Sequence, residues 1–392
     1  MKNVMILSKA LTFGGAERAA AALAGYMAKE CNCILVVIDD ENKTYESDAK
    51  IITLKQSVVN KGHGLALLLW FVKLFFKVRK IRRDYKIDEC ISFLTEPDLI
   101  NILTGSKKSM STISVRNLRS AVVKGKIKRL RDKWLFKKAN RIVATSKMVK
   151  DDLIKVFGAD ESKIEIVYNI CDQNRILNAA QEDCLTDEEK KFFGTGDVVI
   201  TTGRLTGQKG HWHLIRAFSA VVKEHPNAKL AILGQGELND YLQQLIDDYS
   251  LNDSVRILGF KKNPYAYLKK AKIFAFSSFF EGCPNAILEA YAVGLPVVST
   301  DGVGIREIVA PETHYAKKTD CLERCSYGVL TPVCDGEKYD AGKPLTQAEV
   351  EMKKGISLLL EDRECLEHYK QASEERIGFF TKESILGKWI RQ

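Results

Sequence analysis

Two cations lie within a glycine-rich stretch near the middle of the chain. Residues 203–210 read Gly-Arg-Leu-Thr-Gly-Gln-Lys-Gly, and an amphipathic helical pattern starts directly after them. Glycines at a strand-to-helix junction let the backbone approach a ligand closely, and the N-terminus of a helix favours an anion. Arg204 and Lys209 place two positive charges beside that junction. The stretch therefore predicts a phosphate-binding loop, and an ordinary surface turn is the alternative.

A second stretch carries two glutamates around a predicted helix start. Residues 280–290 read Phe-Glu-Gly-Cys-Pro-Asn-Ala-Ile-Leu-Glu-Ala. Pro284 suits the first helical position, where its missing amide hydrogen costs nothing. The amides that would then face phosphate oxygens belong to Asn285, Ala286 and Ile287. Glu281 and Glu289 flank this start and can accept hydrogen bonds from sugar hydroxyls. Taken alone, Glu281 could be an ordinary loop charge and Glu289 a paired surface acid. The whole arrangement predicts a phosphorylated sugar ligand.

Two further glycines mark the ends of neighbouring apolar runs. Residues 233–237 read Leu-Gly-Gln-Gly-Glu and include Gly234, and residues 258–260 read Leu-Gly-Phe and end at Phe260. Successive apolar runs of this kind form adjacent parallel strands, whose carboxyl ends meet at one edge of the sheet. We therefore expect the two loops to lie side by side and to hold a nucleoside base.

These residues would be positioned by two successive sets of alternating strands and helices. In the first half we expect strands at 4–8, 33–38, 89–93, 111–115 and 141–144, with helices at 16–29, 64–83, 126–139 and 147–157. In the second half we expect strands at 198–203, 229–234, 255–260, 273–277 and 296–299, with helices at 211–223, 238–249, 264–270 and 285–293. Such alternation predicts parallel sheets covered on both faces, and 392 residues exceed one ordinary core.

The predicted fold class is therefore α/β, with two Rossmann-like, doubly wound domains facing across a cleft. We expect the first domain at 1–172 and the second at 198–371. The acid-rich segment 173–197 is expected to connect them and to contain a short helix. Residues 372–392 are expected to form a C-terminal helix that packs back on the first domain. Ligands of doubly wound folds bind beyond the carboxyl ends of the strands, which places the predicted site in the cleft.

The order of these motifs resembles glycosyltransferase family 4, whose members are retaining enzymes of the GT-B fold. The resemblance rests on the glycine-Arg-Lys loop, the Leu-Gly-x-Gly strand end and the spacing of Glu281 and Glu289. It extends over residues 198–309 and is supported by Gly14-Gly15-Ala16-Glu17 near the start of the chain. It implies a hexosyltransferase-type enzyme that moves a sugar from a nucleotide-sugar, with UDP the most frequent carrier, to a glycan acceptor. The implied setting is bacterial surface polysaccharide synthesis, such as capsule or O-antigen.

The resemblance also implies a role for each matching residue. Arg204 and Lys209 would clamp the donor diphosphate and stabilise the negative charge of the leaving group. Glu289 would bind the ribose hydroxyls, and Glu281 would bind hydroxyls of the transferred sugar. Further contacts on the donor side are implied for Gly14, Gly15, Gly234, Phe260, Cys283, Pro284, Asn285 and Ala286. No divalent metal or other cofactor is expected, and no protein nucleophile either, because the donor phosphate would accept the proton of the acceptor hydroxyl.

The chain departs from the family pattern after the expected strand at 111–115. Many members have a histidine at this position, whereas this chain has Arg116-Asn117. Arg116 either contacts the donor phosphate or the acceptor in place of that histidine, or it only begins a basic patch.

Positive charge is concentrated in two parts of the first half. The formal net charge is +10, and residues 116–141 hold eleven Lys or Arg but one acid, Asp132. The helix expected at 64–83 begins with an apolar part too short to span a bilayer and ends in clustered cations. This pattern predicts a helix in the membrane interface, while burial of residues 67–76 inside the first domain is the alternative. We therefore expect a cytoplasmic protein that is peripheral on the anionic inner face of the cell membrane. The family resemblance implies an acceptor linked to polyprenyl diphosphate, since members of the family often act on lipid-linked acceptors.

The cysteines are expected to be free. The chain starts with an apolar strand pattern and not with a signal peptide, which predicts a reducing compartment for its ten cysteines. His314, Cys321, Cys325 and Cys334 could be considered as a zinc site, but the paired C-x-x-C spacing is missing.

Other functional classes explain less of the sequence. A nucleic-acid-binding protein would use residues 116–141 with Trp134 and Phe136 as stacking groups, and would leave the motifs of the second half without a role. Nucleic acid is therefore not an expected partner. Within the GT-B fold, a sugar-nucleotide epimerase and a glycan phosphorylase are alternatives, although no motif for a lysine-bound pyridoxal phosphate is present.

Overall fold

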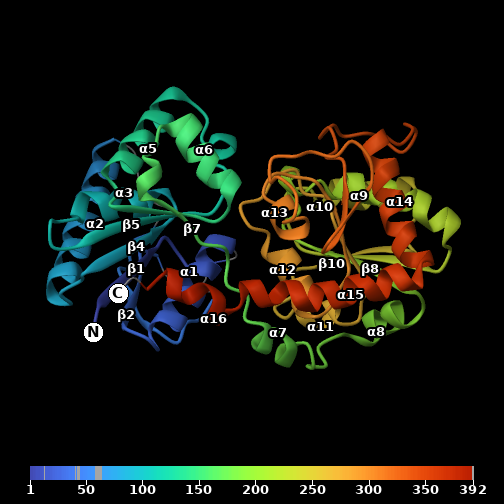
Figure 1. Cartoon of the computed structure of the whole chain (residues 1–392), viewed down its shortest axis with the longest axis horizontal. Coiled ribbons are helices and arrows are strands. Elements are labelled where there is room, and N and C mark those ends of the chain that lie inside the picture. Colours follow the sequence, from blue (N-terminus) through green and yellow to red (C-terminus); the bar gives the residue numbers. More distant parts are fainter. Residues whose placement is uncertain (13, 40, 42–44, 58–63, 391–392) are drawn as a thin grey trace. The chain divides into compact units, whose positions relative to one another are not determined.

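The chain folds into two units (Figure 1). The computed structural model describes residues 1–12, 14–39, 41, 45–57 and 64–390. The first unit is Met1–Ile170 together with Lys382–Gln392, and the second is Cys171–Thr381. Each unit is an α/β structure with its own sheet and core, and each is described by itself.

The first unit is built on a seven-stranded parallel sheet. Its strand order is β3-β2-β1-β4-β5-β6-β7. The central strand β1 and its neighbour β2 are continuous apolar runs, Val-Met-Ile-Leu and Cys-Ile-Leu-Val-Val, which suit a sheet buried on both faces. The strands are β1 Asn3–Ser8, β2 Asn32–Val37, β3 Lys50–Thr53, β4 Glu89–Phe93, β5 Met110–Val115, β6 Arg141–Ala144 and β7 Ile164–Ile166.

Helices cover both faces of this first sheet. The helices are α1 Gly15–Met27, α2 Leu65–Asp84, α3 Thr95–Thr104, α4 Arg119–Val122, α5 Lys126–Lys138 and α6 Lys147–Phe157, followed by η1 Glu161–Lys163. In one layer α2 packs on α3, α3 on α5 and α5 on α6, while α1 lies on the other face (Figure 1). The alternation of β1 matches these layers, because Val4 and Ile6 belong to the core under α1 and Met5 and Leu7 to the core under α2.

The second unit is also built on a seven-stranded sheet, which differs from the first at one edge. Its strand order is β10-β9-β8-β11-β12-β14-β13, and β13 runs antiparallel to β14 at the edge. The strands are β8 Asp197–Thr202, β9 Ala228–Leu233, β10 Val255–Gly259, β11 Ile273–Phe276, β12 Val297–Thr300, β13 Glu323–Cys325 and β14 Gly328–Thr331. The expected strands of both halves are thus present to within one or two residues. The short strands β3, β7, β13 and β14 were not predicted.

Helices also cover both faces of the second sheet. α9 packs on α10 and α14 on one face, and α12 packs on α7 and α15 on the other (Figure 1). The helices are α7 Gln173–Ala179, α8 Asp187–Gly194, η2 Gly207–Lys209, α9 His211–Glu224, α10 Asn239–Asp248, α11 Tyr265–Leu268, α12 Asn285–Ala292, α13 Arg306–Val309, α14 Gln347–Glu361, α15 Arg363–Ile377 and η3 Gly378–Phe380.

The segment expected as an interdomain connection is part of the second unit. Residues 173–197 form α7 and α8 and reach the first residue of β8, so this expectation is corrected. Thr186 and Glu189 form a reciprocal capping box at the start of α8. The carboxylate of Glu189 also accepts hydrogen bonds from Lys261 (2.6 Å) and Tyr267 (2.9 Å). Side-chain contacts therefore fasten the segment to the body of the second unit.

The end of the chain returns to the first unit. The expected single helix over 372–392 is replaced by α15, which already starts at Arg363, and by the short α16 Lys382–Ile385 and η4 Leu386–Lys388. Trp389 is buried and its ring stacks on Phe93 with 6.4 Å between the centroids. The guanidinium of Arg141 donates hydrogen bonds to the backbone carbonyls of Lys388 and Trp389. The tail therefore belongs to the core of the first unit.

Candidate active site

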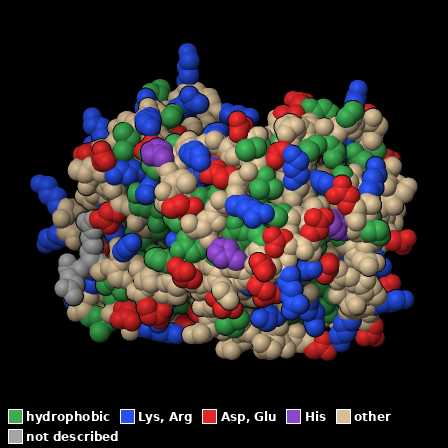
Figure 2. All heavy atoms as spheres, turned by 45° about the vertical axis from the view of Figure 1, so that its right-hand side comes forward, with side chains coloured by type: hydrophobic (Ala, Val, Ile, Leu, Met, Phe, Trp, Pro, Cys, Tyr) green, Lys and Arg blue, Asp and Glu red, His purple; other side chains and the backbone are tan. Residues whose placement is uncertain are grey.

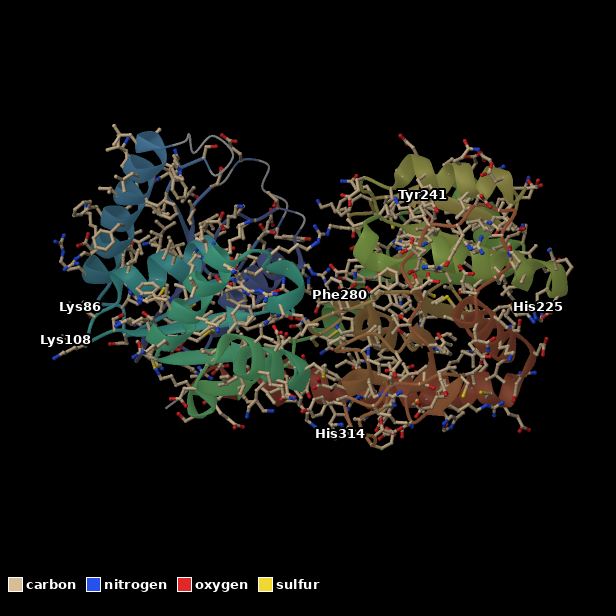
Figure 3. All side chains as sticks on the ribbon, turned by 90° about the horizontal axis from the view of Figure 1, so that it is seen from above. Lys86, Lys108, His225, Tyr241, Phe280 and His314 are labelled. Carbon is tan, nitrogen blue, oxygen red and sulfur yellow. The ribbon has the colours of Figure 1, made fainter. Side chains whose placement is uncertain are left out.

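The predicted phosphate loop and the loop of the first glutamate leave neighbouring strands of the second sheet. β8 lies between β9 and β11, so the connection after β8 runs to one side and the connection after β11 to the other. Doubly wound folds bind their ligands at this switch point, beyond the carboxyl ends of the strands. Phe280, which follows β11, lies at the opposite end of the unit from His225, which precedes β9 (Figure 3). The two loops thus occupy the ligand-binding edge of the sheet.

Hydrogen bonds join these two loops. The amide of Phe279 donates to the carbonyl of Gln208 (3.0 Å), and the hydroxyl of Ser277 donates to the carbonyl of Lys209 (2.8 Å). In the reverse direction, the side-chain amide of Gln208 donates to the carbonyl of Phe280 (2.7 Å). Because each bond crosses from one loop to the other, the positions of Lys209 and Glu281 are fixed together.

Lys209 and Glu281 form an ion pair inside this loop cluster. The distance from Nζ to Oε1 is 2.6 Å, and Nζ lies 4.8 Å from the centre of the Phe276 ring. The two side chains are 16% and 14% exposed, so the pair is shielded from most water but still reaches the surface. Shielding strengthens the interaction of a charge with its neighbours. The structure thus joins the residue expected at the diphosphate to the residue expected at the sugar.

Close backbone contacts explain the glycine at the end of β9. A Cβ atom on Gly234 would lie 1.8 Å from the carbonyl oxygen of Gly203, which belongs to the neighbouring loop. The amide of Gly234 donates to the carbonyl of Gly259 at the end of β10 (2.9 Å). The three strand ends therefore lie side by side, and Phe260, next to Gly259, has an exposed ring at this edge. An exposed aromatic ring at a ligand-binding edge can stack on a flat group such as a nucleobase.

Arg204 stands apart from the ion pair. Its side chain is exposed, and its guanidinium forms no ion pair within the described part of the chain. The preceding Gly203 is packed under the aliphatic part of Lys209, because a Cβ there would lie 3.3 Å from the Cε of that lysine. Both cations thus belong to the same loop. Lys209 is paired with the carboxylate of Glu281, and Arg204 is open to an anion.

The start of α12 differs in detail from the prediction. Pro284 is the N-cap residue, with φ −72° and ψ 100°, and the first helical residue is Asn285. The amide of Ile287 donates to the carbonyl of Pro284 (3.1 Å), so the expectation that it faces a ligand is corrected. For the amides of Asn285 and Ala286, in the first turn of α12, a role towards an anion stays a prediction. Cys283, just before the cap, is buried.

Glu289 lies one helical turn after Asn285 on α12. Residues four apart share a face of a helix, so the carboxylate follows the same side of α12 as Asn285. Glu289 is buried, with 7% of its surface exposed. Carboxylate oxygens accept hydrogen bonds, and sugar hydroxyls can donate them, so the predicted role of Glu289 towards a sugar stays a prediction.

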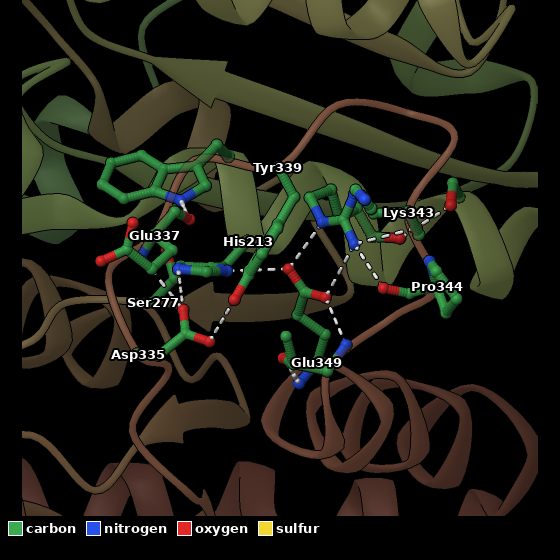
Figure 4. Close-up of polar contacts among 12 residues, drawn as sticks. His213, Ser277, Asp335, Glu337, Tyr339, Lys343, Pro344 and Glu349 are labelled. Atoms are coloured by element: carbon green, nitrogen blue, oxygen red, sulfur yellow. Dashed lines mark hydrogen bonds and ion pairs between the residues drawn. The ribbon is translucent and has the colours of Figure 1, made fainter.

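A buried polar network holds the first turns of α9, which follow Lys209 directly (Figure 4). The carboxylate of Glu349 on α14 is hydrogen-bonded to His213 Nδ1 (2.7 Å) and accepts a hydrogen bond from Arg216 Nε (2.8 Å). Burial opposes the charge of Glu349, but the hydrogen bonds from His213 and Arg216 hold its pKa below the ordinary value. Burial also lowers the pKa of His211 to about 3, so this imidazole at the start of α9 is neutral. The network anchors the helix and not a reacting group.

The remaining predicted residues lie in the first unit. Gly14 is the N-cap residue of α1 after β1, and a Cβ on Gly15 would meet no atom within 4 Å. Arg116 follows β5, donates a hydrogen bond to Asn169 and lies over the ring of Phe93, with 5.6 Å to its centre. The structure thus gives Arg116 partners within the first unit, and its role towards a ligand stays a prediction.

The residues considered for zinc do not gather. No group of three or more His, Cys, Asp or Glu placed to hold a metal ion occurs among residues 1–12, 14–39, 41, 45–57 and 64–390. Of the four candidates, Cys325 and Cys334 are buried and Cys321 is exposed. Burial raises the pKa of Cys325 to about 12, which disfavours the thiolate that binds metals.

Sequence reasoning missed two residues that hold the ion pair. Gln208 links the two loops, and the hydroxyl of Ser278 donates to Glu281 Oε1 (2.7 Å). Their positions next to Lys209 and shortly before Glu281 are the signal that could have pointed to them. Nothing in the sequence alone pairs loops 72 residues apart.

The chain is similar in sequence to known glycosyltransferases. The family described as glycosyl transferases group 1 matches residues 185–319, and the family described as Glycosyltransferase Family 4 matches residues 13–175. An uncharacterised glycosyltransferase of Methanocaldococcus jannaschii is 34% identical over 82% of this chain and 84% of its own length. A Campylobacter jejuni relative is 30% identical over 98% of this chain and 97% of its own. Its name is N-acetylgalactosamine-N,N'-diacetylbacillosaminyl-diphospho-undecaprenol 4-alpha-N-acetylgalactosaminyltransferase.

Solved structures show the same two-unit fold. HepE of Anabaena, in complex with UDP, superimposes with a TM-score of 0.75 at 17% identity and covers 99% of this chain and 98% of its own. Sucrose-phosphate synthase of Thermosynechococcus elongatus also reaches a TM-score of 0.75, at 15% identity, over 99% and 97% of the two chains. With the matching family models and relatives, these likenesses identify the chain as a glycosyltransferase of the GT-B fold that belongs to glycosyltransferase family 4.

Proposed function

We propose that this enzyme transfers a sugar, with retention, from a nucleotide-sugar to a lipid-linked glycan during bacterial surface polysaccharide synthesis. The observation that carries the proposal is the Lys209–Glu281 pair at the switch point of the second sheet. In this proposal the cation of the pair binds the diphosphate, and the neighbouring carboxylate binds sugar hydroxyls. A UDP-linked donor is proposed, supported by the UDP named in the similar Anabaena structure.

The proposed chemistry follows from where charge develops. The bond between the anomeric carbon and the diphosphate oxygen breaks, and negative charge accumulates on the leaving diphosphate. Lys209 and Arg204 stabilise this charge from one loop, and the N-terminus of α12 favours an anion from the other. The acceptor oxygen forms the new glycosidic bond on the face that the leaving group vacates, and the diphosphate takes its proton. Within this scheme the side-chain cations replace a divalent metal.

The acceptor is proposed to be a glycan on polyprenyl diphosphate. The Campylobacter jejuni relative carries diphospho-undecaprenol in its name, and a second relative from that organism, 24% identical over the whole chain, is named for a PP-undecaprenol acceptor. Such an acceptor combines a diphosphate, a sugar chain and a long hydrocarbon. The protein must therefore present cations to the diphosphate and apolar surface to the hydrocarbon, at the membrane where this molecule resides.

The outer face of α2 has both properties. Trp70 and Leu74 are buried on one side of α2. The alternative that residues 67–76 pack inside the first unit is therefore correct for that side. The opposite side exposes apolar side chains, namely Leu65, Leu68, Leu69, Val72 and Phe76. Exposed cations follow on that same side at Arg79, Lys80 and Arg83. An apolar stripe that leads into cations suits a helix in the membrane interface.

α5, in the same helix layer, repeats this arrangement. Its exposed apolar residues Ile127, Leu130 and Trp134 are spaced by three and four, so they form one stripe. The opposite side of α5 buries Leu135 and Phe136. Exposed cations flank the stripe at Lys126, Lys128, Arg129, Lys133, Lys137 and Lys138. On the face in Figure 2, in contrast, acidic and basic side chains are intermingled.

We therefore propose that α2 and α5 bind the anionic inner face of the cell membrane as a peripheral surface. No helix in the described ranges is both long and apolar enough to cross a bilayer. Each cation near an anionic leaflet contributes about 1 kcal/mol, so several together give stable binding without a spanning helix.

The experiment that tests the function is a donor panel. Purified enzyme is incubated in EDTA with UDP-, GDP-, dTDP- and CMP-sugars and with polyprenyl-diphosphate glycans, and nucleotide release and product mass are read together. One donor should yield a glycan longer by one sugar. Nucleotide release or sugar conversion without a longer glycan would instead indicate an epimerase, and activity that requires a restored divalent ion would contradict the proposed cation clamp.

A further inference from the structure

The carboxylate of Glu281 is held by one oxygen only. Oε1 accepts hydrogen bonds from Lys209 Nζ (2.6 Å) and from Ser278 Oγ (2.7 Å). Oε2 makes no hydrogen bond or ion pair with any residue that the structure describes. The side chain is 14% exposed, so the atom without a partner lies where a ligand can reach it. The carboxylate is thus oriented by one oxygen and available through the other.

Ser278 is itself rigidly placed. It is fully buried, and its carbonyl accepts a hydrogen bond from Thr300 Oγ1 (2.6 Å). The hydroxyl also lies 3.3 Å from the carbonyl of Gln208, farther than the Glu281 oxygen. A hydroxyl has one hydrogen to donate, and the shorter distance assigns it to the carboxylate.

A bound donor diphosphate would weaken one of the two hydrogen bonds to Glu281 Oε1, the one from Lys209, and leave the one from Ser278. The proposed role of Lys209 is to bind phosphate oxygens, which compete with Glu281 for the same ammonium group. Ser278 is fully buried, so a diphosphate does not reach its hydroxyl. When the donor is bound, the serine hydrogen bond is therefore the contact that keeps Glu281 oriented.

We propose that Ser278 is a positioning residue that aims Glu281 Oε2 at a hydroxyl of the transferred sugar. This inference rests on the proposed function, because it assigns the other oxygen to the sugar. Ser278 touches neither donor nor acceptor. It acts through Glu281, and its effect is greatest in the state where Lys209 is engaged by phosphate.

The test separates orientation of the sugar from binding of the nucleotide. Ser278→Ala is compared with the wild-type enzyme and with a control, Ser219→Ala. Ser219 is a buried serine on α9 whose hydroxyl donates to the carbonyl of Arg216 (2.7 Å). Turnover at saturating donor is measured beside the dissociation constant of free UDP. Loss of a hydrogen bond to a charged group predicts a fall in kcat of about tenfold to a hundredfold for Ser278→Ala. UDP lacks the transferred sugar, so it should bind Ser278→Ala with an affinity within twofold of that of the wild type.

A mutant cycle with Glu281→Ala gives the second measurement. If Ser278 acts through Glu281, adding Ser278→Ala to Glu281→Ala should lower turnover no further. The inference is overturned by wild-type turnover in Ser278→Ala, by a loss of UDP affinity as large as the loss of turnover, or by additive losses in the cycle. Failure of the wild-type enzyme to use any donor would instead refute the proposed function.

Discussion

At the scale of single residues, burial decides which charged groups differ from their ordinary behaviour. Asp98 on α3 is buried and accepts a hydrogen bond from Ser92 (2.8 Å). Burial raises the pKa of Asp98 to about 8, although the nearby Arg119 opposes the shift. The folded first unit thus holds a proton at Asp98 that the unfolded chain releases near pH 4.

This residue predicts a pH dependence of stability. Because the folded pKa lies above the unfolded one, the contribution of Asp98 is fully present below about pH 4 and is lost as pH rises through about 8. Asp98→Asn keeps an uncharged side chain, so its melting temperature relative to the wild type should rise between pH 5 and pH 9. Tryptophan fluorescence reports mainly on this unit, which holds Trp70, Trp134 and Trp389. The exposed control Asp84→Asn should show no such trend, and a flat difference for Asp98→Asn would refute the assignment.

The candidate site shows what sequence can predict of single residues. Arg204, Lys209, Glu281 and Glu289 could be chosen from type and spacing, because glycines and a proline mark the loops that carry them. Their contacts could not be chosen in this way. The Lys209–Glu281 pair depends on β8 and β11 being neighbours in the sheet, and the buried hydroxyl of Ser278 has no local pattern that reveals it.

At the scale of elements, periodic apolar patterns predicted most strands and helices. The elements that were missed are short or polar, such as β7, which reads Ile-Glu-Ile, and α3, which begins Thr-Glu-Pro-Asp. Their stability comes from tertiary contacts, which a local pattern does not contain. Sequence also could not separate the two sides of α2, because both carry apolar residues and cations.

Arg82 illustrates this limit on α2. It belongs by sequence to the clustered cations that end the helix expected at 64–83, but it is buried and donates to Asn101 and Thr104 on α3 and to Ser111 on β5. We predict that Arg82→Gln lowers the free energy of unfolding by about 2–4 kcal/mol, because it leaves several buried acceptors without a donor. Urea unfolding measures this, with exposed Arg83→Gln as the matched control. Equal stability of the two variants would contradict the buried role.

The membrane surface is tested with the cations that are exposed. Arg79, Lys80 and Arg83 changed together to Gln should weaken binding to anionic vesicles about a hundredfold, since each contributes about 1 kcal/mol. Lys262, Lys269 and Lys270 of the second unit, also exposed, give a control with the same change in net charge. Co-sedimentation with vesicles of mixed neutral and anionic lipid is the measurement. Equal binding of the two triple variants would refute a surface on α2.

At the scale of the whole molecule, the chain starts in the first unit, builds the second, and ends in the first. Sequence could predict two units and a short helix within residues 173–197, but not that this segment is packed within the second unit. The returning tail contributes Ile385, Leu386 and Trp389 to the core under α1. The first unit is therefore completed only when the last residues of the chain are present.

This arrangement predicts an effect of the tail on one unit. Trp389→Ala should lower the stability of the first unit by about 3–5 kcal/mol, as expected for the loss of a buried large aromatic side chain. Urea unfolding followed by circular dichroism should show an earlier first transition and an unchanged second one. Exposed Phe379→Ala, in the second unit, is the control. A single unshifted transition in Trp389→Ala would show that the tail does not support the first unit.

The central claim is that the loop at 203–210 and the start of α12 hold a nucleoside diphosphate through Lys209. Loss of this cation should lower turnover severely while the fold survives, and Glu289→Ala should do the same through the ribose. The most direct measurement is calorimetric titration of UDP, GDP, ADP and dTDP into the wild-type enzyme, Lys209→Ala and the exposed control Lys223→Ala. We predict that one nucleotide binds the wild type and Lys223→Ala equally and Lys209→Ala at least tenfold more weakly. Equal affinity in all three proteins, or no binding of any nucleotide, would contradict the account.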